Sequence, residues 1–222
     1  MKVEQFVMAY GAEQDCLRAF LPEGFESLRP VLRINAEIRQ GVVSLDGTNT
    51  GETVYIEFNT PVEATPIEAT SEATSIKAKG KRGWLNIANW ETPKTEITYE
   101  RNENSVTFKS EFLEITYTGV GIEGGCPAER DNDGVFFLGE NAEFRAAEQI
   151  DSPREFCDCQ FKWKFAEDNA HGISIGGKSV AAYPTEAKHN YEKQKCCPEV
   201  AAAIECRQIL GSYKVVFERR AK

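Results

Sequence analysis

The sequence predicts a mainly β fold, a closed antiparallel β-barrel with two or three short helices, on three observations. Segments in which polar and apolar residues alternate recur along the chain, turn residues separate them at short intervals, and no β–α–β unit repeats. With 222 residues, 41% of them hydrophobic, the chain can bury one substantial core, so we expect a single domain over residues 1–222.

The first elements are predicted as strand, helix, strand and strand. Residues 5–10 form a short, largely apolar strand. Residues 13–21 carry apolar side chains at helical spacing and end at a Pro-Glu-Gly turn. Residues 31–38 and 53–58 alternate with a period of two, which is the period of a half-buried strand.

The alternation places charged and polar residues on shared faces of these two strands. Arg33, Asn35 and Glu37 share one face of the first strand, and Tyr55 and Glu57 share one face of the second. In an open sheet such a face meets solvent, whereas in a closed barrel it points into a polar cavity.

Residues 60–82 are predicted to be a flap or insert. TPVEA at 60–64 is followed by the near-duplicate TPIEA at 65–69, and then by Thr-, Glu- and Ala-rich sequence up to GKRG. Both a plain surface loop and a functional lid are compatible with this composition.

The rest of the chain is predicted to be mostly strands, with one late helix. Residues 198–210 have helical spacing, and Gly211 would end that helix. The remaining strand signals lie at residues 84–90, 95–100, 105–110, 111–119, 135–138, 155–165, 172–182 and 213–219.

Charge and hydropathy exclude several classes of partner. The chain has 26 Lys and Arg against 35 Asp and Glu, a net charge of −9, and the basic residues are scattered. Nucleic acid and anionic membranes are therefore not expected as partners. The sequence contains no long apolar segment and does not begin with a secretory leader, so we expect a cytoplasmic protein.

The seven cysteines are expected to be reduced thiols. Cys157 and Cys159 share one strand face, and Cys196, Cys197 and His189 could complete a zinc site with them. Because no C-x2-C pair is present, and no phosphate-binding or dinucleotide-binding motif, neither a metal nor a cofactor is expected.

The segment YGAEQDCLRAFLPEGFESLRPVLRINAEI, residues 10–38, resembles the N-terminal segment of the acetoacetate decarboxylase-like family. In that family a strand ending in Tyr leads to a helix of D-x-L-R type, a Pro-Glu turn and a Pro-led strand with Arg and Glu. The matching residues are Tyr10, Asp15, Leu17, Arg18, Leu21, Pro22, Glu23, Pro30 and Arg33. Beyond residue 60 the similarity is thin.

This resemblance implies a barrel with a central cavity and, in active members, a lysine that forms a Schiff base with a β-keto acid. In the family this lysine lies in a Pro-Lys-Lys segment. Lys94 belongs to the only Pro-Lys dipeptide in this chain, so it is the candidate nucleophile. Thr95 stands where the family has a second lysine, the neighbour that activates the first. Lys81, beside Arg82, is the rival candidate.

The resemblance also implies acidic site residues. Glu57 matches a family glutamate, and Asn35 or Glu37 occupies the place of the other. We therefore take Glu57 and Glu37 with Lys94 as candidate catalytic residues, and Arg33, Asn35 and Tyr55 as candidate substrate-binding residues. Alternatively, the strand carboxylates and Arg33 form an internal salt bridge that has no role in catalysis. The family's substrate-carboxylate arginine would fall near Val3 and is absent.

The sequence thus predicts a divergent acetoacetate decarboxylase-like protein that acts on or binds a small keto or organic acid. If it is active through a Schiff-base lysine, it is a carboxy-lyase. The alternative is a non-catalytic small-molecule-binding β-barrel, and a third hypothesis is a protein-interaction domain that uses the 60–80 segment and an acidic surface. The family resemblance is also compatible with a homo-oligomer.

Overall fold

The fold is built on one large β-sheet. The structure is a computed structural model, and it describes residues 1–43, 49–65, 80–123, 135–138, 143–146, 150, 152–164, 173–176, 178–180 and 204–219. The strands of the large sheet are β1 Lys2–Gly11, β2 Phe25–Ser27, β3 Val31–Val43, β4 Asn49–Ala64, β5 Arg82–Glu91, β6 Thr98–Arg101, β7 Ser105–Lys109, β8 Leu113–Glu123, β9 Val135–Leu138, β10 Glu143–Ala146, β11 Arg154–Trp163 and β14 Gln208–Glu218.

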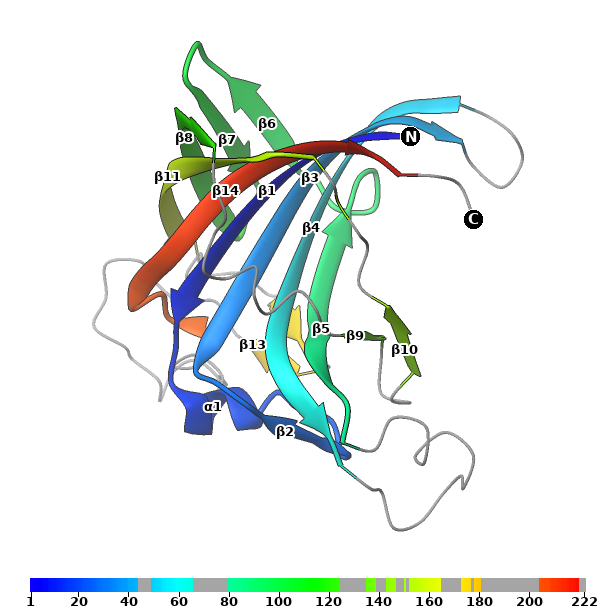
Figure 1. Cartoon of the computed structure of the whole chain (residues 1–222), viewed down its shortest axis with the longest axis vertical. Coiled ribbons are helices and arrows are strands. Elements are labelled where there is room, and N and C mark those ends of the chain that lie inside the picture. Colours follow the sequence, from blue (N-terminus) through cyan, green and yellow to red (C-terminus); the bar gives the residue numbers. More distant parts are fainter. Residues whose placement is uncertain are drawn as a thin grey trace.

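The strand order is β10-β9-β5-β4-β3-β1-β14-β11-β8-β7-β6, with β2 paired to β4. All pairs are antiparallel except β5 with β9, which is parallel. Strands β14, β1, β3, β4 and β5 run side by side through the middle of the molecule, with α1 (Gln14–Arg18) and β2 at one end and the β6–β8 strands at the other (Figure 1).

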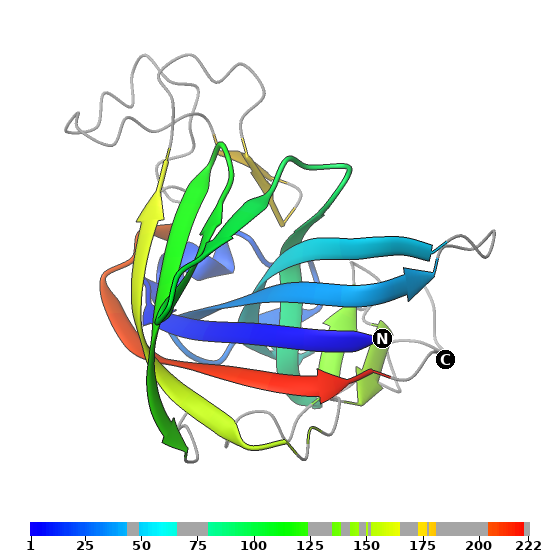
Figure 2. The ribbon, with the colours of Figure 1, turned by 90° about the horizontal axis from the view of Figure 1, so that it is seen from above.

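The predicted barrel is not closed by hydrogen bonds. The two edge strands, β10 and β6, are not paired with each other in the described part of the chain. The sheet curls instead (Figure 2), and β6–β8 approach β1 through side chains. Arg101 of β6 forms an ion pair with Glu4 of β1, and Tyr117 of β8 packs on Phe6. Side-chain contacts thus do part of what backbone pairing would do in a closed barrel.

Both faces of the central strands are buried. One face of β3 carries Leu32, Ile34, Ala36 and Ile38 into the main core; the main core also contains Phe6, Met8, Tyr10, Ile56, Phe58, Leu85, Phe108 and Ile115. The opposite face carries polar side chains and a second apolar cluster of Val3, Val7, Tyr213, Val215 and Phe217. The polar row predicted for β3 is therefore enclosed even though the sheet is not a closed barrel.

The late helix was predicted wrongly where the structure describes it. Residues 208–210 belong to β14, and Gly211 lies inside that strand, where it pairs with Ala9 of β1. The pairing with β1 overrides the helical spacing of the sequence. Residues 198–203 lie outside the described residues. The helix predicted over 13–21 is confirmed as the shorter α1, which is the only helix longer than one residue in the described ranges.

The predicted flap begins later than expected. Residues 60–64 continue β4, and they pair with β5 on one side and with β2 on the other. Residues 66–79 lie outside the described residues. Strand β10, which the sequence analysis did not predict, pairs with β9.

A small hairpin packs against the large sheet. Strands β12 (Ile173–Ile175) and β13 (Lys178–Val180) flank Gly176, whose N–H donates to the carbonyl of Ile87 on β5. Gly176 has a φ of +54°, and a Cβ at this position would lie 2.5 Å from the carbonyl oxygen of Phe20. Only glycine fits this close approach of two backbones.

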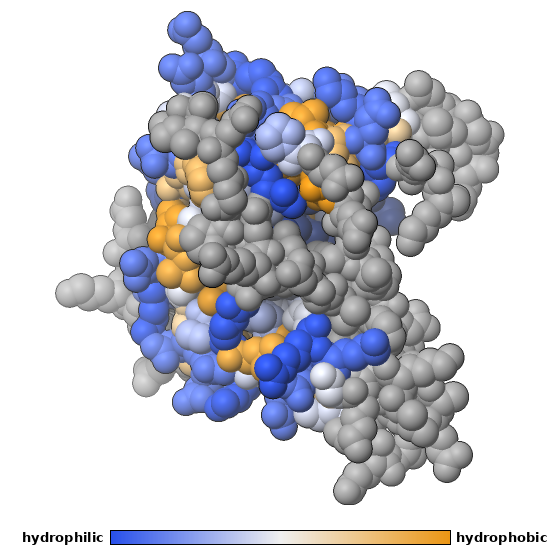
Figure 3. All heavy atoms as spheres, viewed as in Figure 1, coloured by the Kyte–Doolittle hydropathy of each residue, from blue (hydrophilic) through white to orange (hydrophobic). Residues whose placement is uncertain are grey.

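The described surface is mostly hydrophilic on the face that Figure 3 shows, with apolar patches between the polar groups. Among the described residues, only Met1 and Leu210 are large hydrophobic residues that are exposed. No helix of the described chain has the length and hydropathy of a membrane span.

Candidate functional site

The structure brings together five of the six predicted site residues. In the pairing of β3 with β4, Asn35 lies opposite Glu57, and Glu37 lies opposite Tyr55. Arg33 is the next residue of the same face on β3. Arg33, Asn35 and Glu37 are 4%, 1% and 2% exposed, so this polar row is shielded from solvent.

A chain of hydrogen bonds links Arg33 to Glu57. The Nε of Arg33 donates to Oδ1 of Asn35 at 2.9 Å, and Nδ2 of Asn35 donates to Oε1 of Glu57 at 2.6 Å. The Arg33 guanidinium also lies 5.2 Å from the centre of the Trp84 ring, a cation–π distance. The strand geometry and these contacts hold the positive charge of Arg33 on one side of Asn35 and the carboxylate on the other.

Glu57 is surrounded by neutral donors. Besides Asn35, the hydroxyl of Tyr55 donates to its Oε2 at 2.9 Å, and Nδ2 of Asn86 donates to the same oxygen at 3.2 Å. Burial, followed by the nearby Glu57 carboxylate, raises the pKa of Tyr55 well above its ordinary value. Tyr55 therefore stays protonated and remains a donor.

Two asparagines that the sequence analysis did not single out complete this polar cluster. Asn59 continues the period of two from Tyr55 and Glu57, and it lies opposite Arg33 in the β3–β4 pairing. Its Oδ1 accepts a hydrogen bond from Asn86 at 3.4 Å. Its Nδ2 is buried and has no hydrogen-bond acceptor among the described residues. The alternation of the strand is the signal that could have identified Asn59.

We call Arg33, Asn35, Glu57, Asn59 and Asn86 the central polar cluster. It combines one guanidinium, one carboxylate and three amides on adjacent strands. Buried polar groups on rigid strands are typical of preformed small-molecule sites.

Glu37 belongs to a second, adjoining network of charges. Its carboxylate accepts two hydrogen bonds from Arg219 at 3.0 Å, one from Arg39 at 2.6 Å, and one from Gln5 at 2.8 Å. Burial alone would raise the pKa of Glu37, but the guanidiniums of Arg219 and Arg39 outweigh it and hold this pKa below its ordinary value. Nη1 of Arg39 also donates to Oε1 of Glu91 at 3.0 Å, which adds Glu91 to the network. This network fits the internal salt bridge considered from the sequence.

Lys94 forms no hydrogen bond or ion pair with either network in the part of the chain that the structure describes. It is exposed, on the turn that follows the end of β5. Lys81, the rival candidate, is also exposed, immediately before β5 begins. Three arginines supply positive charge to the two networks: Arg33, Arg39 and Arg219.

Of the described cysteines, Cys157, Cys159 and Cys206 are free thiols. Burial raises the pKa of Cys157 and of Cys206 to about 11. Within the described ranges, no three His, Cys, Asp or Glu side chains are grouped as a metal site. The other residues of the considered zinc site, Cys196, Cys197 and His189, lie outside the described residues.

Comparison with solved structures identifies the fold. The acetoacetate decarboxylase from Legionella pneumophila matches 97% of this chain and 81% of its own chain, with a TM-score of 0.58 and 11% sequence identity. An acetoacetate decarboxylase-like enzyme from Sphingomonas wittichii matches with a TM-score of 0.53 and 10% identity, covering 97% of this chain and 87% of that one.

A third match is the enduracididine biosynthesis enzyme MppR in complex with pyruvate, with a TM-score of 0.53 and 12% identity over 97% of this chain and 84% of that one. No protein-family model and no curated protein sequence matches the chain. The chain thus has the acetoacetate decarboxylase-like fold, and the resemblance seen in residues 10–38 extends to the whole architecture.

Proposed function

We propose that this protein of acetoacetate decarboxylase-like fold binds a small keto or organic acid at the central polar cluster, without a covalent bond to a lysine. We therefore call this cluster the acid-binding cluster from here on. One observation carries the proposal. Two buried donors, Arg33 and Asn59, lie opposite each other on β3 and β4, and Nδ2 of Asn59 has no acceptor among the described residues.

A carboxylate is the ligand group that suits these donors. An unpaired buried amide costs about 1–3 kcal/mol, which an incoming acceptor would recover. The buried guanidinium of Arg33 favours an acceptor that carries a negative charge, because charge-assisted hydrogen bonds are the stronger ones. Asn86, which already contacts Asn59, adds a second amide next to the same position.

Glu57 would set the orientation of such a ligand. Its two oxygens are fixed by Asn35, Tyr55 and Asn86, so the carboxylate has a defined position two residues from Asn59 on β4. A carboxylate so placed could accept a hydrogen bond from a hydroxyl or enol group of the acid, or exchange a proton with it. The negative charge of Glu57 would also keep the ligand's own carboxylate on the Arg33 side.

The lysine positions favour binding over Schiff-base chemistry. Formation of an imine needs an amine that is activated by an enclosed apolar site or by a neighbouring cation. Lys94 and Lys81 are exposed at the two ends of β5. Decarboxylation through Lys94 is the second candidate function, and it is supported by the Pro93-Lys94 pair together with the fold.

The proposal is tested with Asn59→Leu, titrated with pyruvate and with acetoacetate by calorimetry. Leucine has a similar volume and removes the unpaired donor, so the variant should stay folded. Its affinity for either acid should fall about tenfold or more, the equivalent of one lost hydrogen bond to a charged group.

Asn102→Leu is the matched control. Asn102 is an exposed asparagine between β6 and β7, and it is not part of the acid-binding cluster. Its replacement should leave the affinity unchanged. Equal affinity of the wild type and Asn59→Leu, or no binding of any small acid to the wild type, would overturn the proposal.

A further inference from the structure

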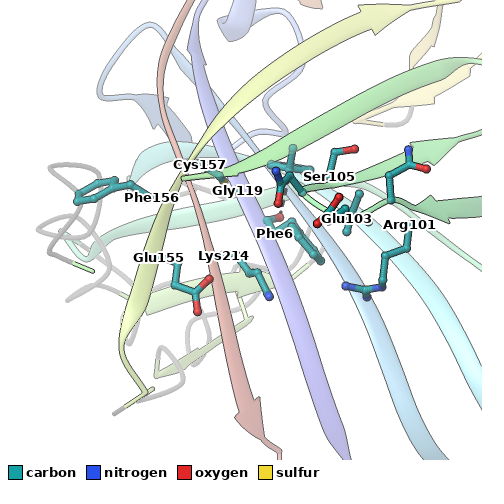
Figure 4. A pocket seen from close by; sticks show the side chains of 13 residues that line it. Phe6, Arg101, Glu103, Ser105, Gly119, Glu155, Phe156, Cys157 and Lys214 are labelled. Atoms are coloured by element: carbon teal, nitrogen blue, oxygen red, sulfur yellow. Dashed lines mark hydrogen bonds between the residues drawn. The ribbon is translucent and has the colours of Figure 1, made fainter. Parts of the chain in front are cut away.

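A cavity of about 300 Å³ lies away from the acid-binding cluster, between the β6–β7 hairpin and strands β1, β8, β11 and β14 (Figure 4). None of the five residues of the acid-binding cluster lines it. It forms where two neighbouring strands separate. Strand β11 pairs with β14 only through residues 154–156, and beyond a bulge at Phe156 and Cys157 it continues with β8 alone.

The floor of the cavity is apolar and rigid. It is formed by Phe6, Val106 and Tyr117, which also belong to the main core. The rings of Phe6 and Tyr117 are 5.2 Å apart, and Phe6 packs edge-on against Phe108 at 5.4 Å. Residues held in this way give a preformed surface for an apolar group.

One part of the rim is positively charged. Arg101 and Lys214 both line the cavity, and both pair with Glu4, at 2.6 Å and 3.2 Å. The side chains of Arg101 and Lys214 are 45% and 29% exposed, against 17% for Glu4. Two cations thus share one carboxylate and keep one net positive charge, with donors still open to solvent.

The rim also holds two carboxylates that are not neutralised in this way. Glu103 and Glu155 line the cavity, are exposed, and form no ion pair with any residue that the structure describes. Glu155 lies directly opposite Lys214 in the β11–β14 pairing, and Figure 4 shows Arg101 and Glu103 across Phe6 from that pair. Charges of both signs therefore stand above one apolar floor.

This combination selects against ligands of a single charge. An anion without an amine that binds at Arg101 and Lys214 would be repelled by Glu103 and Glu155. A cation without a carboxylate that binds at these two glutamates would be repelled by Arg101 and Lys214. A ligand with both charges satisfies both sets.

We propose that this cavity is a second binding site, for a small zwitterion with an apolar side chain, of the α-amino acid class. The ligand's carboxylate is directed to Arg101 and Lys214, and its ammonium group to Glu155. Its side chain rests on the floor formed by Phe6, Val106 and Tyr117. No bond is made or broken, so the site is a sensing or holding site and not a catalytic one.

The test compares four ligands by calorimetry on the full chain. L-leucine carries both charges and an apolar group; leucinamide lacks the carboxylate, 4-methylpentanoate lacks the amine, and glycine lacks the side chain. We expect L-leucine to bind and each of the others to bind about tenfold more weakly, as expected for loss of one charge-assisted contact or of the apolar contact.

Two matched variants test where the ligand binds. Glu155→Gln should weaken L-leucine binding about threefold to tenfold, the range for a partly exposed ion pair. Asp158→Asn removes one carboxylate from the same strand at an exposed position that does not line the cavity, and it should have no effect. Asn59→Leu should not change L-leucine binding either, which separates this site from the acid-binding cluster.

Three results would overturn the inference. The first is equal binding of leucinamide or of 4-methylpentanoate, which would make this a site for a cation or an anion. The second is equal loss of affinity in Glu155→Gln and Asp158→Asn. The third is no heat of binding from L-leucine up to about 10 mM, beyond the range of weak specific binding.

Discussion

The guanidinium of Arg219 donates two hydrogen bonds to the carboxylate of Glu37, at 3.0 Å each, from the far side of β1. Arg219 follows β14, Glu37 stands on β3, and Gln5 of the intervening β1 donates to the same carboxylate. This contact ties the C-terminal end of the described chain to the middle of the sheet.

We expect Glu37→Gln to lower the free energy of unfolding by about 3–5 kcal/mol near neutral pH, because it removes the charge of a buried carboxylate that pairs with the half-buried Arg219 and Arg39. The pKa of Glu37 is lower in the folded state than its ordinary value of 4.5. Its contribution is therefore complete above about pH 4.5 and is lost as the pH falls through the lowered pKa. The difference between variant and wild type should shrink over that window in urea denaturation.

The control for Glu37 is Glu218→Gln. Glu218 is an exposed carboxylate at the end of β14, so its removal changes the net charge equally without breaking the network. It should change stability by less than about 0.5 kcal/mol. A pH-independent effect of Glu37→Gln would contradict the assignment to an ionised carboxylate.

Lys94 should not form an imine. After treatment with acetoacetate and borohydride, we expect no covalent adduct by mass spectrometry, because the exposed amine lacks an enclosing site. Lys94→Ala should bind pyruvate as the wild type does. A reduced adduct mapped to Lys94 would restore the carboxy-lyase mechanism, and an adduct on any other lysine would also refute non-covalent binding.

Gly176→Ala should destabilise the fold by about 2 kcal/mol or more, through its positive φ and through contact with a neighbouring backbone. Gly80→Ala isolates the first cause: Gly80 has a φ of +70°, but a Cβ there would meet nothing within 4 Å. We expect Gly80→Ala to cost only about 1 kcal/mol. If chemical denaturation showed that both substitutions lower the free energy of unfolding equally, the contact with the Phe20 backbone would not be the cause.

Cys157 should react slowly with iodoacetamide at neutral pH. Burial raises the pKa of its thiol to about 11, so the reactive thiolate is scarce until the solution becomes strongly alkaline. Peptide mapping of a labelling series across pH would measure this. The same increase with pH is expected for Cys206, whereas half-maximal labelling of Cys157 near pH 9, the ordinary value of a thiol, would contradict it.

The polar row of β3 was predictable because side-chain direction on a strand follows from the sequence with a period of two. The same rule places Tyr55, Glu57 and Asn59 on one face of β4, although Asn59 was overlooked. The partners across strands were not predictable: the pairing of Asn35 with Glu57, and the reach of Arg219 to Glu37, depend on strand order and register.

Residues 208–211 show where sequence patterns fail. Their apolar spacing and the glycine fit the end of a helix, yet they pair with Tyr10, Gly11 and Ala9 of β1. Backbone pairing in the sheet outweighs a local preference of a few tenths of a kcal/mol per residue. Lys94 is a related case, since the dipeptide Pro93-Lys94 gives no information on which way the turn exposes its side chain.

The amino-acid sequence by itself determined that this protein is mostly β-structure, that polar and apolar residues alternate on its central strands, and that its N-terminal segment resembles acetoacetate decarboxylase-like proteins. Only the tertiary structure decided which polar groups meet, that both faces of β3 are buried without closure of the sheet, and that a cavity opens where β11 leaves β14. The physical reason is that alternation is a local property of the backbone, whereas burial and ion pairing arise from contacts between strands distant in sequence.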